Sequence, residues 1–192
     1  MHALARILAL VLFGAIGLTG CSPSRLPLTR KAPPDSYRVH NGSFEQDTGW
    51  TRSAPMGFSE YAVLRFDDGD ARSGRRSAYA AIRRHPRVPQ ALHGWTQKIR
   101  PLPRGRTIRF GGWVKVTGAP HVQFGIEYER RQAVKGRTLF SVELPPVPAD
   151  DRYHFVQQQV QLPEDVEELV LYLGITRIGA ARFDDVFLKV VD

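Results

Sequence analysis

The chain has 192 residues, of which 42% are hydrophobic and 24% charged, with a formal net charge of +8 and a single cysteine. This composition is that of a globular domain, because disordered chains are poorer in apolar residues and collagen-like or disulfide-rich chains are far richer in glycine or cysteine. A lone cysteine also excludes an intramolecular disulfide.

Residues 1–20 predict an export signal that is removed. Arg6 precedes a continuous apolar run over residues 7–18. A run of about twelve residues is too short to span a bilayer as a permanent helix, and it has the length of the apolar core of a signal peptide. The alternative, a buried core helix, is disfavoured because no polar residue alternates with the apolar ones.

The boundary after this run has a more specific pattern. Leu18-Thr19-Gly20-Cys21 resembles the lipobox of bacterial lipoproteins. The resemblance implies cleavage before Cys21, acylation of Cys21 with fatty acids such as palmitate, and anchoring to a lipid bilayer. Because Ser22 rather than aspartate comes next, it implies sorting to the bacterial outer membrane, with the domain facing the periplasm or the cell surface.

Residues 21–36 predict a flexible tether, since four prolines stand among small polar residues without an apolar period. Removal of residues 1–20 would leave a net charge of +7, of which the tether holds +2 and the domain from residue 37 holds +5. A positive domain favours acidic partners such as anionic glycans or lipid headgroups, although its arginines can equally be plain solvated residues. An exported lipoprotein rarely meets nucleic acid, which argues against that class of partner.

Residues 37–192 predict one all-β domain. Apolar residues alternate along short runs that glycine and proline separate, and the clearest run is 108–116, with Ile108 and Val114 on one face and Trp113 on the other. The other expected strands are 62–66, 77–83, 95–99, 121–128, 154–162, 169–175 and 182–191. No segment has sustained helical periodicity. This many strands in about 155 residues indicates two packed antiparallel sheets.

Several short motifs, in chain order, are similar to carbohydrate-binding modules of the CBM4/9-like, galactose-binding-domain type. They are Asn41, Phe44 and Glu45 followed by Gly49-Trp50, then Ser73-Gly74-Arg75-Arg76-Ser77, Gln97, Gly111-Gly112-Trp113-Val114-Lys115 and Phe183-Asp184-Asp185-Val186. The resemblance implies an antiparallel jelly-roll β-sandwich whose first and last strands lie side by side.

The same resemblance implies a structural calcium ion, Ca²⁺, that joins the two ends of the domain. Its ligands would be Glu45 and Asp184, with Asp185 as a further candidate, and backbone carbonyls near Asn41 and Arg76 would complete a shell of six to eight oxygens. The alternative is that Glu45 and Asp184 accept hydrogen bonds from the backbone or from neighbouring arginines.

Catalysis is not expected. The sequence has no nucleophile elbow, zinc-protease motif, phosphate loop or dinucleotide fingerprint. Acid pairs such as Asp67-Asp68 and Glu127/Glu129 have the residue types of a glycosidase dyad, but in β-proteins such pairs are far more often turn or solvated residues.

Binding is the better hypothesis, because polar and aromatic residues on the outward strand faces would share one concave sheet if these strands are neighbours. The candidate ligand-binding residues are Trp113, Tyr172, Gln123, Gln157, Gln159, Arg109 and Glu127, with Gln161 in line with the two preceding glutamines. Rings cover the C–H faces of sugars, and amides reach their hydroxyls. The alternative for Trp113 is that a loop covers it, whereas Trp50 and Trp95 are expected in the core.

The leading prediction is therefore a non-catalytic, membrane-anchored lipoprotein that binds an envelope or environmental polysaccharide. The second is a structural or protein-interaction lipoprotein, which joins an envelope protein partner and has no sugar site.

Overall fold

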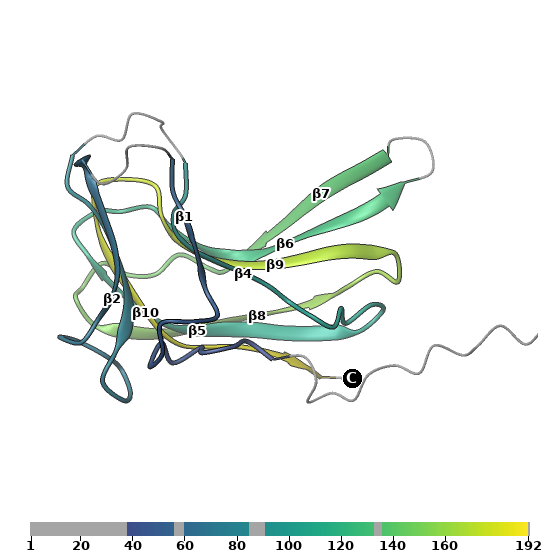
Figure 1. The fold of residues 1–192 in the computed structure, drawn as a ribbon, viewed down its shortest axis with the longest axis horizontal. Coiled ribbons are helices and arrows are strands. Elements are labelled where there is room, and N and C mark those ends of the chain that lie inside the picture. The colour runs from purple at the N-terminus through teal and green to yellow at the C-terminus, as the bar shows by residue number, and fades with distance from the viewer. Residues whose placement is uncertain (1–37, 56–59, 85–90, 133–135, 192) are drawn as a thin grey trace, which may run out of the picture. The chain divides into compact units, whose positions relative to one another are not determined.

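The computed structural model describes residues 38–55, 60–84, 91–132 and 136–191, all of which belong to one compact unit. These residues form ten β-strands and no α-helix (Figure 1). A helix with the length and hydrophobicity needed to cross a membrane is absent from these ranges. The predicted signal peptide, Cys21 and the tether lie outside the described residues.

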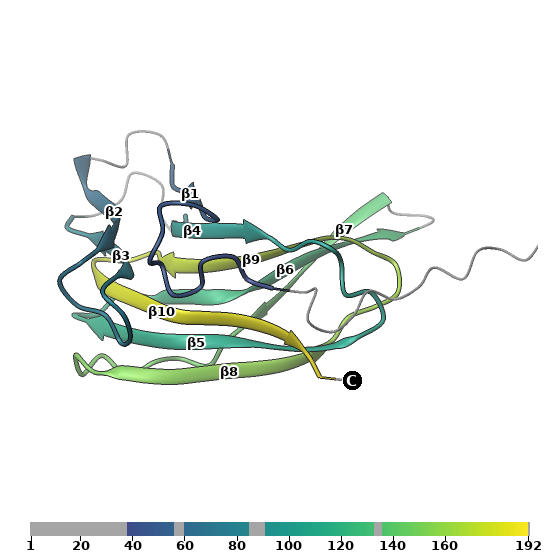
Figure 2. The same cartoon turned by 60° about the horizontal axis from the view of Figure 1, so that its bottom comes forward.

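Two five-stranded antiparallel sheets make up the domain (Figure 2). Sheet A has the order β1 (Thr51–Ser53), β4 (His93–Lys98), β9 (Val166–Ile175), β6 (Val122–Gln132) and β7 (Gly136–Glu143). Sheet B has the order β2 (Ala62–Asp67), β3 (Ser77–Ile82), β10 (Gly179–Val190), β5 (Thr107–Thr117) and β8 (Tyr153–Gln161). This is a jelly-roll β-sandwich, so the predicted fold class is confirmed.

The core lies between the sheets and follows from the alternation of apolar residues. The inward residues Ile108, Phe110, Val114 and Val116 of β5 are all buried, and so are Leu169, Leu171, Leu173 and Ile175 of β9. Each large apolar side chain buried in this way stabilises the fold by about 1.5–3 kcal/mol. Trp95 is buried and Trp50 packs partly buried against the core, as predicted.

Each of the eight strands expected from alternation corresponds to one observed strand, whereas β1 and β7 were not predicted. β1 has three residues, two of them exposed, and therefore gives no alternating pattern.

The implied pairing of the first strand with the last strand is wrong. The first strand, β1, pairs with β4 in sheet A, and the last strand, β10, lies between β3 and β5 in sheet B. What reaches β10 is the turn that precedes β1: the Val186 N–H donates to the Gly42 carbonyl oxygen at 2.9 Å. A Cβ atom at Gly42 would lie 2.0 Å from the Val186 carbonyl oxygen, so only glycine allows this approach.

Asn41 organises this turn. Its side-chain amide donates to the carbonyls of Gln46 and Thr48, and its own carbonyl accepts the indole N–H of Trp50 at 2.9 Å. Phe44 follows with a φ of 57° and is fully buried, which fixes the turn to the core. The first of the family-like motifs is therefore a structural device.

Candidate functional site

The acidic residues at the two ends of the domain bind opposite ends of one turn, residues 72–76. Asp184 Oδ2 accepts the backbone N–H groups of Arg72 at 2.8 Å and Ser73 at 3.0 Å. Glu45 Oε1 accepts those of Arg75 at 2.8 Å and Arg76 at 3.0 Å. The turn thus links the segment before β1 to β10.

The two carboxylates stand in different environments. Asp184 is fully buried, and burial raises its pKa although backbone N–H groups work in the opposite direction. Glu45 is exposed, and the N–H groups of Arg75 and Arg76 lower its pKa. Gly74, with a φ of 60°, lies against Glu45: a Cβ atom there would come 2.4 Å from Oε1.

These contacts match the alternative to a calcium site, in which Glu45 and Asp184 accept hydrogen bonds from the backbone. The groups that face both carboxylates are N–H donors rather than oxygen ligands, and Asp185 Oδ1 accepts the Ser73 hydroxyl at 2.7 Å. In the part of the chain that is described, no three His, Cys, Asp or Glu residues are grouped so that they could hold a metal ion. Donors of this kind favour the hydrogen-bonded alternative over a calcium site, and chelation tests the choice between them.

The predicted sugar-binding residues divide between the two sheets. Tyr172, Gln123 and Glu127 lie on β9 and β6 of sheet A, whereas Trp113, Arg109, Gln157 and Gln159 lie on β5 and β8 of sheet B. The expectation that they share one concave sheet is wrong, because the chain crosses between sheets after β5 and again after β7 and β8.

The three predicted residues of sheet A, Gln123, Glu127 and Tyr172, line a cleft of about 210 Å³ on the outer face of that sheet. Figure 1 shows β7 at the edge of this sheet, next to β6. All five strands contribute, and the lining residues are Ser53, Leu92, Thr96, Gln123, Glu127, Glu143, Val170 and Tyr172. Ser53, Thr96 and Glu143 were not predicted, because β1 and β7 were not recognised and Thr96 has no distinctive sequence neighbour.

Tyr172 lies across the floor of the cleft. It stands opposite Gly125 on β6, where a Cβ atom would come 2.6 Å from the tyrosine oxygen, so the ring occupies the space that glycine leaves. Its hydroxyl is 2.9 Å from Ser141 Oγ and 3.5 Å from Glu143 Oε1. Burial raises the pKa of Tyr172 to about 12, so the hydroxyl keeps its proton and remains a donor at neutral pH.

Two carboxylates give the cleft its charge. Burial, together with the charge of Glu143, raises the pKa of Glu127. Gln123 Nε2 lies 3.5 Å from Glu143 Oε1, at the outer limit for a hydrogen bond. The described residues of the lining include no cation, so they offer mainly hydrogen-bond acceptors together with the amide of Gln123 and hydroxyl groups.

The predicted residues of β5 and β8 lie on a separate surface, the outer face of sheet B. Trp113 is half-buried, and the guanidinium carbon of Arg72 lies 4.5 Å from its ring centroid, so the turn covers it in part, as the alternative reading allowed. Arg109 Nη2 lies 3.5 Å from Gln159 Oε1. Phe155, 46% exposed beside Trp113, was missed although it has the same parity along β8 as the predicted glutamines.

Neither a protein-family profile nor a curated protein sequence matches this chain. Solved structures do. A family 22 carbohydrate-binding module of Clostridium thermocellum Xyn10B, in whose cleft conserved residues have a role in ligand binding, aligns with a TM-score of 0.59 at 15% identity over 83% of this chain and 96% of that one.

Two further structures align over most of their length. A family 16 carbohydrate-binding module has a TM-score of 0.55 at 18% identity, covering 80% of this chain and 99% of its own. A CBM4 structure has a TM-score of 0.50 at 19% identity, covering 80% and 99%. At these identities the likeness shows a shared fold: the chain has the jelly-roll of carbohydrate-binding modules.

Proposed function

We propose that this protein binds carbohydrate in the cleft on the outer face of sheet A and does not catalyse a reaction. The observation that carries the proposal is the cleft itself, in which Glu127, Glu143 and the Tyr172 hydroxyl converge with no cation among the lining residues that the structure describes. Its support is the fold shared with the family 22 module of Xyn10B, in which cleft residues have a role in ligand binding.

The lining favours a neutral polysaccharide. Sugar hydroxyls donate to carboxylates, and the Gln123 amide and the Tyr172 hydroxyl can both donate and accept. An acidic sugar would bring its carboxylate close to Glu127 and Glu143, which costs free energy because like charges repel. Ring stacking contributes little, because Tyr172 is only 5% exposed and is the sole aromatic residue among the described residues of the lining.

The proposal includes the location that the leader implies: the acyl chains on Cys21 would hold the domain at the bacterial outer membrane. Labelled palmitate incorporated by the full chain, and lost in Cys21→Ala, supports the anchor. Recovery of the label in both proteins, or in neither, overturns it.

Affinity electrophoresis of the purified full chain in gels that contain xylan, mixed-linkage β-glucan or galactomannan tests the binding. We expect one of these neutral polysaccharides to retard the protein and Glu127→Gln to reduce the retardation. Glu60→Gln, which changes an exposed glutamate outside the lining, is the matched control.

Three results count against the proposal. Equal retardation of Glu127→Gln and the wild type removes the cleft as the site. Release of new reducing ends from the polysaccharide contradicts the non-catalytic role. No retardation by any neutral polysaccharide, together with crosslinking to an envelope protein, favours the structural or protein-interaction lipoprotein.

A further inference from the structure

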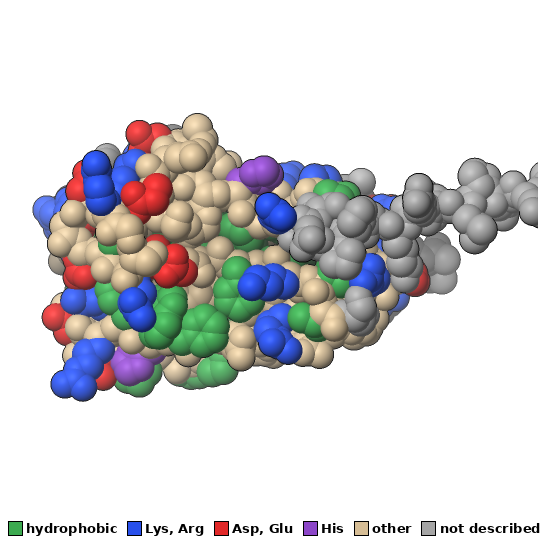
Figure 3. All heavy atoms as spheres, turned by 90° about the horizontal axis from the view of Figure 1, so that it is seen from below, with side chains coloured by type: hydrophobic (Ala, Val, Ile, Leu, Met, Phe, Trp, Pro, Cys, Tyr) green, Lys and Arg blue, Asp and Glu red, His purple; other side chains and the backbone are tan. Residues whose placement is uncertain are grey.

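The outer face of sheet B carries a second set of exposed groups, distant in the fold from the cleft. The turn that contains Asp70 and residues 72–76 covers one end of this face, where it binds Asp184 and Lys115. We call the remainder the aromatic–basic face; it consists of Trp113, Phe155, Phe187, Arg72, Arg109, Lys189, Gln157, Gln159 and Gln161. In Figure 3, which views this side, hydrophobic side chains gather at the centre and basic ones stand beside them.

The three aromatic rings form one continuous row. Trp113 lies opposite Phe155 on the neighbouring strand, and their ring centroids are 5.3 Å apart. Phe155 and Phe187 belong to strands on either side of β5, yet their rings stack at 6.0 Å with 9° between the planes. They meet because Gly111, which lies opposite Phe187 on β5, has no side chain to separate them. Phe155 is exposed and the other two rings are half-buried, and a connected apolar patch at the surface is typical of interaction sites.

The cations of this face contact aromatic rings and an amide. Arg72 lies over the ring of Trp113 at 4.5 Å and Lys189 over that of Phe187 at 5.5 Å, while Arg109 reaches a neighbouring glutamine. Within the ranges that the structure describes, none of the three pairs with a carboxylate. Their positive charges are therefore available to a ligand.

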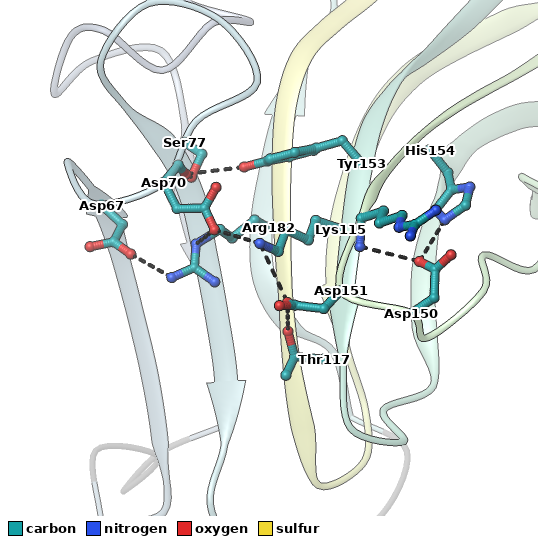
Figure 4. A network of polar contacts seen from close by, with 11 residues as sticks. Asp67, Asp70, Ser77, Lys115, Thr117, Asp150, Asp151, Tyr153, His154 and Arg182 are labelled. Carbon is teal, nitrogen blue, oxygen red and sulfur yellow. Dashed lines mark hydrogen bonds and ion pairs between the residues drawn. The ribbon is translucent and has the colours of Figure 1, made fainter.

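The covered end of the same sheet is built differently, as Figure 4 shows. Arg182 pairs with Asp67 at 3.0 Å and with Asp70 at 3.6 Å. Lys115 pairs with Asp70 at 2.8 Å and with Asp151 at 3.4 Å. Each of these cations is neutralised by two aspartates, so the unpaired cations of the aromatic–basic face are not a general property of this basic protein.

The glutamines distinguish between two kinds of acidic partner, an acidic polysaccharide and an anionic lipid bilayer. Gln157, Gln159 and Gln161 are exposed at every second position of β8, the edge strand of the sheet. Their amides donate and accept hydrogen bonds, which the hydroxyls of a polysaccharide satisfy. The apolar part of a bilayer would leave the NH₂ groups of these amides without acceptors, at a cost of about 1–3 kcal/mol each.

We propose that the aromatic–basic face binds an acidic polysaccharide, as a second site independent of the sheet A cleft. The rings of Phe155 and Phe187 cover the C–H faces of the sugars. Arg109 and Lys189 pair with sugar carboxylates, and the glutamine stripe binds hydroxyls. Asp185, which borders the face, is already held by the Ser73 hydroxyl.

The test compares binding of the purified full chain to immobilised polygalacturonate, to a neutral galactan, and to vesicles of phosphatidylcholine and phosphatidylglycerol in equal parts. We expect binding to polygalacturonate that falls about tenfold, which is about 1.4 kcal/mol, in Arg109→Gln/Lys189→Gln, which lacks two cations of the face, and in Phe155→Ala, which lacks the exposed ring. Arg84→Gln/Arg177→Gln removes the same charge from exposed positions elsewhere and should bind like the wild type.

The possible outcomes separate this site from the cleft. Loss of polygalacturonate binding in the face variants, but not in Glu127→Gln, supports the proposal even if no neutral polysaccharide binds the cleft. Equal weakening in the charge-matched control would show non-specific attraction and overturn it. So would binding to the vesicles alone, or no binding to polygalacturonate.

Discussion

Glu127 occupies a position in the cleft that opposes its ionised form. Burial and the charge of Glu143 raise its pKa above the ordinary value of 4.5. The folded state therefore holds the proton of Glu127 more strongly than the unfolded chain does, and this residue lowers stability progressively as the pH rises from about 4.5 through the raised pKa. A group kept at such a cost is typical of functional sites.

Replacing the carboxylate of Glu127 by an amide should remove the loss of stability that its ionisation causes. Glu127→Gln is expected to melt a few degrees above the wild type at pH 7, and no more, because the side chain is only half-buried. The difference should vanish near pH 4, where both states of the wild type are protonated. Melting curves across this pH range, with Glu60→Gln as control, measure it; a gain that is independent of pH would show that charge is not the cause.

Gly125 sets the shape of the cleft floor. A Cβ atom there would lie 2.4 Å from the Val142 carbonyl oxygen and 2.6 Å from the Tyr172 hydroxyl oxygen. Gly125→Ala is expected to displace the ring or the neighbouring strand and to lower the free energy of unfolding by about 1–3 kcal/mol. Gly69→Ala, whose Cβ atom would be 3.8 Å from its nearest neighbour, is the matched control in urea unfolding. Equal midpoints for the two variants would contradict this account.

At the scale of the elements, the turn of residues 72–76 forms a clasp: its N–H groups bind both β10 and the segment that precedes β1. Three backbone N–H groups point at the carboxylate of Asp184, from Arg72, Ser73 and Asp185. An amide has one acceptor oxygen and presents donors in place of the other, so it cannot receive all three.

Asp184→Asn is therefore expected to lower the free energy of unfolding by about 2–3 kcal/mol, because it leaves buried N–H groups unpaired. Asp185→Asn keeps an oxygen for the Ser73 hydroxyl and should cost less than about 1 kcal/mol. Urea unfolding of the two variants gives the comparison. A loss in Asp185→Asn as large as that in Asp184→Asn would show that the clasp does not depend on the buried carboxylate.

Strands were predictable where one face is buried and the other is not. The inward residues of β5 and β9 are buried as expected, although in β9 the outward Tyr172 is buried too. β7 was missed although it supplies Glu143 to the cleft, because the alternation in Gly136–Glu143 is interrupted by polar and small residues. The order in which the strands pair was harder to predict, because the alternation of a strand does not say to which of two sheets it belongs. Tyr172 and Trp113 were therefore expected on one sheet, whereas they lie on the outer faces of opposite sheets.

At the scale of the whole molecule, the motifs that resemble carbohydrate-binding modules prove to hold the fold together. Asn41 shapes the first turn, and Gln97 receives the His40 N–H and donates to the carbonyls of His40 and Gly49. Glu45 and Asp184 bind the turn between them. These motifs thus indicated the architecture, whereas Gln123, Glu127, Glu143 and Tyr172 of the cleft belong to none of them.

The same structural role bears on calcium. Glu45 and Asp184 join the beginning and end of the domain through N–H donors, so the joint is complete without an ion between them. We therefore expect the melting temperature of the purified full chain to be the same in excess chelator as in millimolar calcium chloride. A melting temperature that falls in chelator and recovers when calcium is restored would reinstate the calcium site. Loss of this response in Glu45→Gln would then assign the ion to the joint, because the amide retains an acceptor for the turn but loses the charge that a divalent cation requires.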